Sequence, residues 1–528
     1  MIAHLAELLS SAAAAAGDRV ALVEASTGRR TTWAELDVEV DRVAQGLNAM
    51  GLVAGYRVVL VLTNRTEFVT LYLGALRAGL VAVPVNPRST TGEIARLLAV
   101  CGARLVVADA GTAATVRQAV AGIADALAGD GAPTGVVPRI GVVGAPGLPG
   151  ETTYDGLVAA AGSWAPVAVD PERLAVLLYT SGTSGRPRAA MLSHRALLAN
   201  VEQNASVDPP MLTPDDVILG VLPLFHVYGL NAVLGQVLRQ QARLVVVDGF
   251  DVEDTLSVIE DEAVSVLPVA PPVFAYWQGV DDLGERLSGV RLVLSGSAPL
   301  APARVAAFTA RTGIEVHQGY GLTEAAPVVT STLRSQHPKP GSVGSALPGI
   351  ELRLVDEHGH APEGQDSGEI QVRGDNLFDG YWPDGVDGPD AEGWYATGDV
   401  GFLDGDGDLF LVDRVKELVI VSGFNVYPSE VEDVIAEVEG VAEAAVIGTD
   451  DPRTVEAVVA YVRPVPGSSY DPDALTAAVR EHCAVRLARF KQPSQLHVVE
   501  ELPHTATGKV AKGRLRATQR RRAMGLLE

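Results

Sequence analysis

Short, continuous apolar runs alternate with helical patterns through the first part of the chain. RVVLVLT (57–63) and LVAVPVNP (80–87) lack polar alternation, and EFVTLYLGALRAG (67–79) between them has helical spacing. Continuous apolar strands are typical of sheets buried on both faces, as in α/β folds. The same rhythm predicts further strands at 103–110, 174–180, 216–224, 242–249, 264–271 and 290–300. The Gly- and Pro-rich segment 126–150 is expected to be a surface connection.

The pattern changes after about residue 340. ELRLVD, GEIQVRG and DVGFLDGDGDLFLVD alternate apolar and polar positions around DGDG, which predicts antiparallel hairpins or a small barrel. The stretch 426–441 has a good helix start at Pro428 and Ser429. Two strands and another helix follow it. We therefore expect an α/β protein with two domains: a large N-terminal domain of layered sheets and helices, 1–413, and a small α+β C-terminal domain, 414–528. The large domain divides into α/β subdomains, 1–340, and a β-rich, barrel-like subdomain, 341–413.

The N-terminus is predicted to form an amphipathic helix rather than a secretory signal. It lacks a cationic start, and His4 and Glu7 stand where a signal has basic or apolar residues. The apolar positions at helical spacing are Ile2, Leu5, Leu8 and Leu9. No run of about 18 apolar residues is present, so we expect no membrane span and a cytoplasmic location.

Composition narrows the classes of function. The chain has 528 residues, of which 47% are hydrophobic, and this excludes a disordered protein. Its net charge of −24 argues against nucleic-acid binding, which needs many exposed cations. Cys101 and Cys483 are the two cysteines, too few for a disulfide framework or a zinc cluster.

The strongest local signal is LAVLLYTSGTSGRPRAAMLSHRALLAN (174–200). A predicted strand runs into Thr180-Ser181-Gly182-Thr183-Ser184-Gly185, and Arg188 follows. Hydroxyls and glycine amides at this density can surround a polyanion, and Arg188 adds a full charge. The spacing is not that of GxxxxGK[ST]. A Gly/Ser turn alone can also be an ordinary loop.

Two further motifs offer nucleotide-binding groups. In VHQGYGLTEAAP, Tyr320 can stack on a base, Thr323 offers a hydroxyl, and Glu324 is a hard oxygen ligand suited to Mg²⁺. The same residues can instead form a glycine turn before a helix cap. Asp399, after Gly398, can accept both ribose hydroxyls or be a turn aspartate, and DGDGD lacks the glutamate of an EF-hand loop.

The C-terminal end carries cations. Lys509 follows Gly508 in a Thr/Gly loop, which suits a cation that enters and leaves an active site, although an exposed lysine is the simpler alternative. A basic cluster closes the chain and forms either a solvated helix or a contact with an anionic cofactor. Its members are Lys512, Arg514, Arg516, Arg520, Arg521 and Arg522.

Taken together, these four motifs resemble those of the ANL superfamily of adenylate-forming enzymes, and the chain is most similar to its acyl-CoA synthetases (fatty-acid–CoA ligases). The motifs occur in family order, and the resemblance covers essentially the whole chain. It implies an AMP-binding N-terminal domain and a mobile C-terminal domain. It also implies ATP-dependent activation of a carboxylic acid, expected to be a medium- or long-chain fatty acid. An acyl-adenylate then becomes an acyl-CoA, with Mg²⁺ as cofactor, coenzyme A as co-substrate and AMP and pyrophosphate as products. A homodimer is a possible assembly.

The resemblance also implies roles for individual residues. Those that would hold the ATP phosphates are Thr180, Ser181, Gly182, Thr183, Ser184, Gly185 and Arg188. Those that would frame the adenine are Gly296, Ser297, Ala298, Gln318, Gly319 and Tyr320. Thr323 would contact the α-phosphate, Glu324 would bind Mg²⁺, and Asp399 and Arg414 would fix the ribose. His226 would lie beside the acyl group, and Lys509 would bridge the substrate carboxylate and α-phosphate. Lys416 matches the hinge, and Gly423 would line the coenzyme A path.

Three positions bear on how far the resemblance extends. The family usually has Lys at Arg188 and Gly at Ala189, and Arg keeps the charge but not the shape of Lys. Acetate-restricted relatives have Trp at the position of Gly321, so Gly321 leaves room for a larger acyl group or is required by the backbone.

Several alternative functions remain. One is a fatty acyl-AMP ligase or a stand-alone adenylation enzyme that delivers to a carrier protein. Another is an aryl-CoA ligase. A luciferase is disfavoured. A noncatalytic nucleotide-binding protein is disfavoured because Glu324, Asp399, Arg414 and Lys509 are all present.

Overall fold

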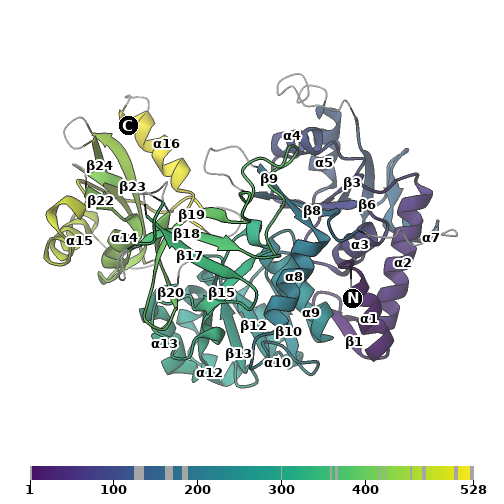
Figure 1. Ribbon diagram of the computed structural model, residues 1–528, viewed down its shortest axis with the longest axis horizontal. Helices are drawn as coiled ribbons and strands as arrows, with labels where there is room; N and C mark the ends of the chain where they lie inside the picture. Colours follow the sequence, from purple (N-terminus) through teal and green to yellow (C-terminus); the bar gives the residue numbers. More distant parts are fainter. Residues whose placement is uncertain are drawn as a thin grey trace. The chain divides into compact units, whose positions relative to one another are not determined.

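The computed structural model describes residues 3–123, 136–160, 170–180, 188–298, 300–356, 359–362, 367–414, 417, 419–421, 424–451, 455–465, 471–504 and 509–523 (Figure 1). These residues divide into two compact units. The first contains the chain up to Glu351 together with Arg373–Tyr395, and the second contains Leu352–Val372 and the chain from Ala396 onward. The subdomain boundary predicted at residue 340 and the domain boundary predicted at residue 413 remain predictions.

One sheet of the first unit carries the strands predicted near the N-terminus. Its strand order is β7 (Thr152–Thr153), β6 (Arg139–Val143), β5 (Leu105–Asp109), β3 (Arg57–Val61), β4 (Val81–Pro84), β8 (Leu174–Thr180) and β9 (Arg188–Ser193). The pairs from β7 to β8 are parallel, and β8 and β9 are antiparallel. The helices that follow β3, β4 and β5 are α3 (Thr66–Arg77), α4 (Thr91–Cys101) and α5 (Ala113–Ala121).

Residues of α4, α5 and the sheet form one apolar core. It includes Val59, Val83 and Val106 from the strands with Ile94 and Val116 from the helices. The expectation of a surface connection at 126–150 was wrong for β6, which pairs with β5 inside this sheet. The run RIGVV is short and flanked by glycine- and proline-rich sequence, so the average composition concealed a buried strand.

The second sheet of this unit is larger. Its strand order is β16 (Ser345–Ala346), β15 (Val328–Ser331), β14 (Val316–Gly321), β13 (Leu292–Ser295), β12 (Val266–Val269), β10 (Val217–Gly220), β11 (Arg243–Val246), β1 (Val20–Glu24) and β2 (Arg29–Thr32). The pairs from β1 to β14 are parallel. Its helices are α10 (Val252–Asp261), α11 (Pro272–Tyr276), α12 (Leu283–Arg286) and α13 (Pro302–Thr312), and they share an apolar core with the strands. The strands therefore confirm the predicted α/β architecture.

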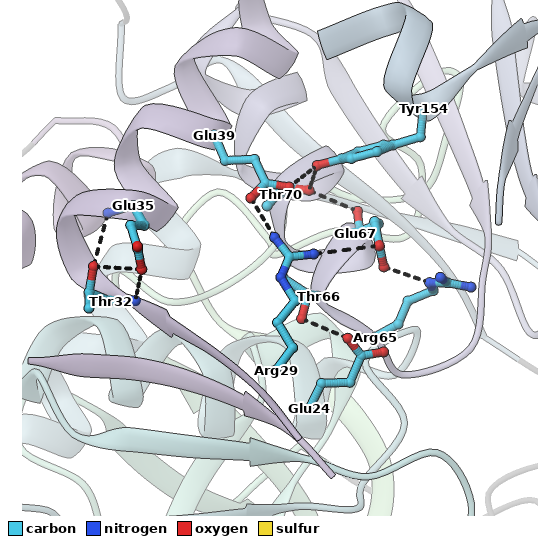
Figure 2. Close-up of polar contacts among 10 residues, drawn as sticks. All are labelled: Glu24, Arg29, Thr32, Glu35, Glu39, Arg65, Thr66, Glu67, Thr70 and Tyr154. Atoms are coloured by element: carbon cyan, nitrogen blue, oxygen red, sulfur yellow. Dashed lines mark hydrogen bonds and ion pairs between the residues drawn. The ribbon is translucent and has the colours of Figure 1, made fainter. Parts of the chain in front are cut away.

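The remaining helices of the unit include the predicted N-terminal one. They are α1 (Glu7–Ala16), α2 (Trp33–Ala49), α7 (Tyr154–Ala159), α8 (His194–Ala205), the π-helix η1 (Tyr228–Gly235) and α9 (Gln236–Gln240). Leu8 and Leu9 of α1 are buried, as its apolar spacing predicts. Helix α2 begins with a capping box, in which Thr32 and Glu35 satisfy each other's backbone amides (Figure 2).

The second unit contains two sheets, both with antiparallel pairs, as the alternating pattern predicted. The first has the order β17 (Glu351–Val355), β18 (Gly368–Arg373), β19 (Tyr395–Leu403) and β20 (Leu409–Arg414). The second has β22 (Phe424–Val426), β21 (Val419–Val421), β24 (Val455–Pro464) and β23 (Val441–Asp451), with β25 (Gln495–Val498) beside β24. Its helices are α14 (Pro428–Ala436), α15 (Pro472–Arg486) and α16 (Lys512–Ala523). Helix α14 begins at the predicted Pro428.

Among the described residues, no helix combines the length and the apolar character that a bilayer span requires.

Candidate active site

The antiparallel strands β8 and β9 place both ends of the predicted phosphate loop together. Thr180, the last residue of β8, lies opposite Arg188, the first residue of β9, and the Thr180 hydroxyl donates to the Arg188 carbonyl at 3.4 Å. Ser181, Gly182, Thr183, Ser184 and Gly185 lie outside the described residues. The segment 181–187 therefore connects two paired strand ends.

The Arg188 side chain packs against an aromatic ring that the sequence analysis did not single out. Its guanidinium carbon lies 3.7 Å from the centre of the Tyr381 ring, and its Nη2 pairs with an Asp387 carboxylate oxygen at 2.7 Å. Arginine, with its planar guanidinium, is well suited to stacking on an aromatic face. Tyr381 follows a glycine in DGYW, which is a weak sequence signal without the fold.

The two segments predicted to frame the adenine lie next to each other. Strands β13 and β14 are parallel neighbours, with Ser295 opposite Gln318. The Gly296-Ser297-Ala298 stretch leaves β13 at the same end of the sheet at which Gln318, Gly319 and Tyr320 complete β14. Parallel strands direct the groups at their carboxyl ends to one edge, where open α/β sheets bind ligands. The fold thus brings both predicted segments together.

Strand β14 ends at Gly321, against the backbone of Pro327. The approach leaves no space for a side chain at residue 321. This packing supports the interpretation that Gly321 is required by the backbone. Thr323 and Glu324 follow in the short 3₁₀ helix η3 (Thr323–Ala325).

Glu324 is buried and hydrogen-bonded. The residue is only 9% exposed, and the Tyr381 hydroxyl donates to Glu324 Oε1 at 2.5 Å. Burial, together with the negative charge of Glu324, raises the pKa of Tyr381 far above its usual value. The hydroxyl is therefore protonated at neutral pH and donates to one oxygen of the Glu324 carboxylate.

His226 lies just before η1, in a segment that reaches the predicted adenine site. The Tyr228 amide donates to His226 Nδ1 at 3.3 Å, and a Cβ on Gly296 would lie 3.1 Å from Cε1 of Tyr228. His226 and Tyr228 retain some exposure, whereas Val227 and Leu230 are buried. Burial raises the pKa of the Tyr228 hydroxyl. Tyr228 was not among the residues predicted from the sequence, although it follows His226 by two residues.

The second unit brings together the two residues predicted to bind ribose. Asp399 of β19 lies opposite Arg414 of β20 in the antiparallel register. Asp399 is 9% exposed, and its amide donates to the Thr397 hydroxyl at 3.1 Å. Two residues separated by a hairpin thus become neighbours, as a shared ribose contact requires.

Lys509 stands at the end of the loop predicted to carry it. His504 and Val510 form an antiparallel bridge that brings both ends of this loop together, and Lys509 is exposed. Lys416 and Gly423 lie outside the described residues. In the basic cluster, Lys512 pairs with Glu417 at 3.0 Å and with Glu432 at 2.9 Å, so this lysine stabilises its own unit.

Comparison with known proteins assigns the family. The family described as "AMP-binding enzyme" matches residues 9–382, and "AMP-binding enzyme C-terminal domain" matches residues 430–509. The chain belongs to the AMP-binding enzyme family. It is an AMP-forming acid–CoA ligase of the ANL superfamily, so the resemblance in the sequence is confirmed.

Three similar proteins align with nearly the whole length of this chain. A 4-coumarate–CoA ligase 5 of Oryza sativa subsp. japonica is 35% identical over 95% of this chain and 92% of its own length. ATP-bound MatB from Rhodopseudomonas palustris is 32% identical, with a TM-score of 0.86 over 97% of this chain and 98% of its own. The anthranilate CoA ligase AuaEII in complex with anthranoyl-AMP is 25% identical, with a TM-score of 0.89 over 99% and 100%.

CoA ligases of this AMP-binding family use ATP, Mg²⁺ and coenzyme A. The Glu324 carboxylate suits the metal. The described residues contain no group of three or more potential metal-ligating side chains. Mg²⁺ is usually held by one or two carboxylates together with substrate phosphates and water. A single buried carboxylate therefore fits a metal that arrives with ATP.

Proposed function

We propose that this acid–CoA ligase activates an aromatic carboxylic acid through an acyl-adenylate and transfers it to coenzyme A. The observation that carries the proposal is the pair His226 and Tyr228, which keep exposed surface within a buried apolar segment beside Gly296. An aromatic acid can stack on the Tyr228 ring, because aromatic pairs favour offset or edge contacts. The similar 4-coumarate–CoA ligase and the anthranoyl-AMP complex support this choice.

The first half-reaction joins two anions. A carboxylate oxygen attacks the α-phosphorus of ATP, the bond to the β-phosphate oxygen breaks, and pyrophosphate leaves with its electron pair. Cations must offset the repulsion between these partners. We assign Thr180, the residues 181–185 and Arg188 to the β- and γ-phosphates, and Lys509 to the carboxylate and α-phosphate.

The remaining site residues orient the nucleotide in this proposal. Glu324 would hold Mg²⁺, which supplies charge neutralisation at the phosphates when bound. Thr323 would donate to the α-phosphate. The residues that would frame the adenine are Gly296, Ser297, Ala298, Gln318, Gly319 and Tyr320. Asp399 and Arg414 would fix the ribose, which agrees with their opposite positions on β19 and β20.

In the second half-reaction the coenzyme A thiol loses its proton to solvent or to the leaving phosphate, and its sulfur attacks the acyl carbon. The bond between the acyl carbon and the phosphate oxygen breaks, and AMP leaves with that electron pair. One site must then exchange nucleophiles, so we propose that the C-terminal domain turns about Lys416, withdraws Lys509 and presents Gly423 to the pantetheine arm. His226 would lie beside the acyl group in both steps. A homodimer and a cytoplasmic location stay predictions.

A panel of acids tests the substrate. Purified enzyme receives ATP, Mg²⁺, coenzyme A and one of 4-coumarate, benzoate, octanoate, palmitate or acetate, and AMP release and acyl-CoA are measured. We expect kcat/KM for the better aromatic acid to exceed that for octanoate by about tenfold or more, since one missing pocket contact costs about this much. Faster turnover of octanoate or palmitate would support the fatty-acid reading instead, and preference for acetate would contradict both.

The acceptor is tested separately. Omission of coenzyme A should leave acyl-AMP and no thioester, and its addition should convert the acyl-AMP into acyl-CoA. Accumulation of acyl-AMP in the presence of coenzyme A, with transfer to a carrier protein, would establish the carrier-dependent alternative.

A further inference from the structure

Tyr381 lies between two residues that belong to different predicted motifs. Its hydroxyl donates to the Glu324 carboxylate at 2.5 Å, and the face of its ring lies 3.7 Å from the guanidinium carbon of Arg188. The Tyr381 residue is only 8% exposed. One buried side chain therefore touches both the carboxylate assigned to the metal and the cation assigned to the phosphates.

The backbone around Tyr381 is pinned from both sides. On one side, the Trp382 amide donates to the Ala189 carbonyl at 2.9 Å, and Tyr381 itself bridges Ala190 of β9. On the other side, the Phe378 amide donates to the Glu324 carbonyl at 2.9 Å. These bonds fix the backbone of Tyr381 relative to β9 and η3. The contacts with Glu324 and Arg188 then fix the side chain.

A tight turn after Tyr381 presents the second partner of Arg188. A Cβ on Gly380 would lie 2.1 Å from the Gly385 carbonyl oxygen, so the turn closes only with glycine, and Asp387 has a positive φ of 54°. The Arg188–Asp387 pair is partly exposed, with side-chain exposures of 34% and 70%, and such pairs are weak. Arg188 can therefore exchange Asp387 for a phosphate while its guanidinium stays on the Tyr381 ring.

We propose that Tyr381 is a positioning residue for the adenylation half-reaction, orienting the Glu324 carboxylate toward Mg²⁺ and holding the Arg188 guanidinium toward the ATP phosphates. The inference rests on the proposed roles of Glu324 and Arg188. A hydrogen bond to a metal-ligating carboxylate fixes the orientation of its oxygens, and loss of such a bond commonly weakens metal binding. The ring face restricts the guanidinium through a cation–π contact.

Two substitutions separate the two contacts. Tyr381→Phe removes the hydroxyl but keeps the ring, and Tyr381→Leu removes both. The dissociation constant of ATP is measured by calorimetry with Mg²⁺ and again with EDTA. We expect Tyr381→Phe to weaken MgATP binding about tenfold and to leave metal-free ATP binding unchanged. Tyr381→Leu should weaken metal-free binding as well, because Arg188 loses its support.

A matched control removes the same kind of bond elsewhere in the first unit. The Tyr154 hydroxyl of α7 donates to Glu39 of α2 at 2.6 Å (Figure 2). Tyr154→Phe should therefore leave both ATP dissociation constants unchanged. A loss equal to that of Tyr381→Phe would show a general effect on folding and would overturn the inference, as would unchanged MgATP binding by Tyr381→Phe.

A double-mutant cycle tests the path through Glu324. In a Glu324→Gln background, Tyr381→Phe should have no further effect on the Mg²⁺-dependent part of ATP binding. Additive losses, or an undiminished Mg²⁺ dependence in Glu324→Gln, would overturn the inference. These binding measurements need no acid, so they remain decisive even if the aromatic-substrate proposal fails in the acid panel.

Discussion

A Cβ atom placed on Gly321 would lie 2.2 Å from the carbonyl oxygen of Pro327, and 3.2 Å from the Cα of Val328. Both neighbours are backbone atoms, which cannot rotate away as a side chain can. A residue that the sequence links to the acyl pocket is thus also a packing requirement between β14 and the chain that follows η3.

We expect Gly321→Ala to destabilise the enzyme by about 1–3 kcal/mol, the usual cost of overpacking, and to lower turnover of all acids alike. Thermal unfolding and the acid panel measure this. Gly92→Ala is the control, because Gly92 lies in α4 with no atom near its missing Cβ. Selective loss of the larger acids at unchanged melting temperature would show that Gly321 acts through the pocket alone.

Arg188→Lys restores the residue usual in the family but removes the planar group that lies on Tyr381. We expect the products to stay the same and the KM for ATP to rise by about tenfold or less, in line with the loss of one cation–π contact. Arg188→Ala should have a larger effect, because the charge is lost as well. Steady-state kinetics with varied ATP check this, and a change of product in Arg188→Lys would contradict it.

Lys509 is expected to serve only the first half-reaction. Lys509→Ala should lower acyl-adenylate formation by about 100-fold or more, a typical effect of removing one transition-state contact. Thioester formation from a synthetic acyl-adenylate should be unchanged. Pyrophosphate exchange and coenzyme A consumption measure the two halves separately. Lys339→Ala, another exposed lysine, is the control, and equal loss of both halves in Lys509→Ala would refute the separation.

Acid should weaken the packing of the residues just before α1 against the start of α8. The rings of His4 and His194 lie 4.2 Å apart, and both are buried. Nδ1 of His4 accepts from the Ala6 amide and Nδ1 of His194 accepts from the Leu5 amide, so both rings must be neutral. Burial lowers the pKa of His194 to about 3 and lowers that of His4 as well.

The unfolded chain, with histidine pKa values near 6.5, binds these protons before the folded chain does. The free energy of unfolding should therefore be fully retained above about pH 6.5 and fall between about pH 6.5 and pH 3. At pH 5 the loss through His194 alone is about 2 kcal/mol. Urea unfolding at pH 7 and pH 5 measures this. His194→Gln should reduce the difference between the two pH values, and the exposed His360→Gln should not. An equal difference in all three proteins would contradict the assignment.

Local sequence determined the family and most of the elements of this enzyme. Continuous apolar runs such as 57–63 and 174–180 can be buried only within a sheet covered on both faces, so they predicted the parallel strands. Glu324, Asp399 and Lys509 are predicted to be site residues because their chemistry and their glycine-rich surroundings are visible in a few neighbouring residues. The strand β6 was missed because its short apolar run lies in a segment dominated by glycine and proline.

Only the tertiary structure decided which distant residues meet. Tyr381 reaches Glu324 and Arg188 because the segment 378–382 pairs with β9 on one side and with η3 on the other. Tyr228 reaches Gly296 because η1 packs where β13 ends. Such contacts depend on strand order and on close backbone approach between segments far apart in the chain. Neither the periodicity nor the composition of either segment carries that information.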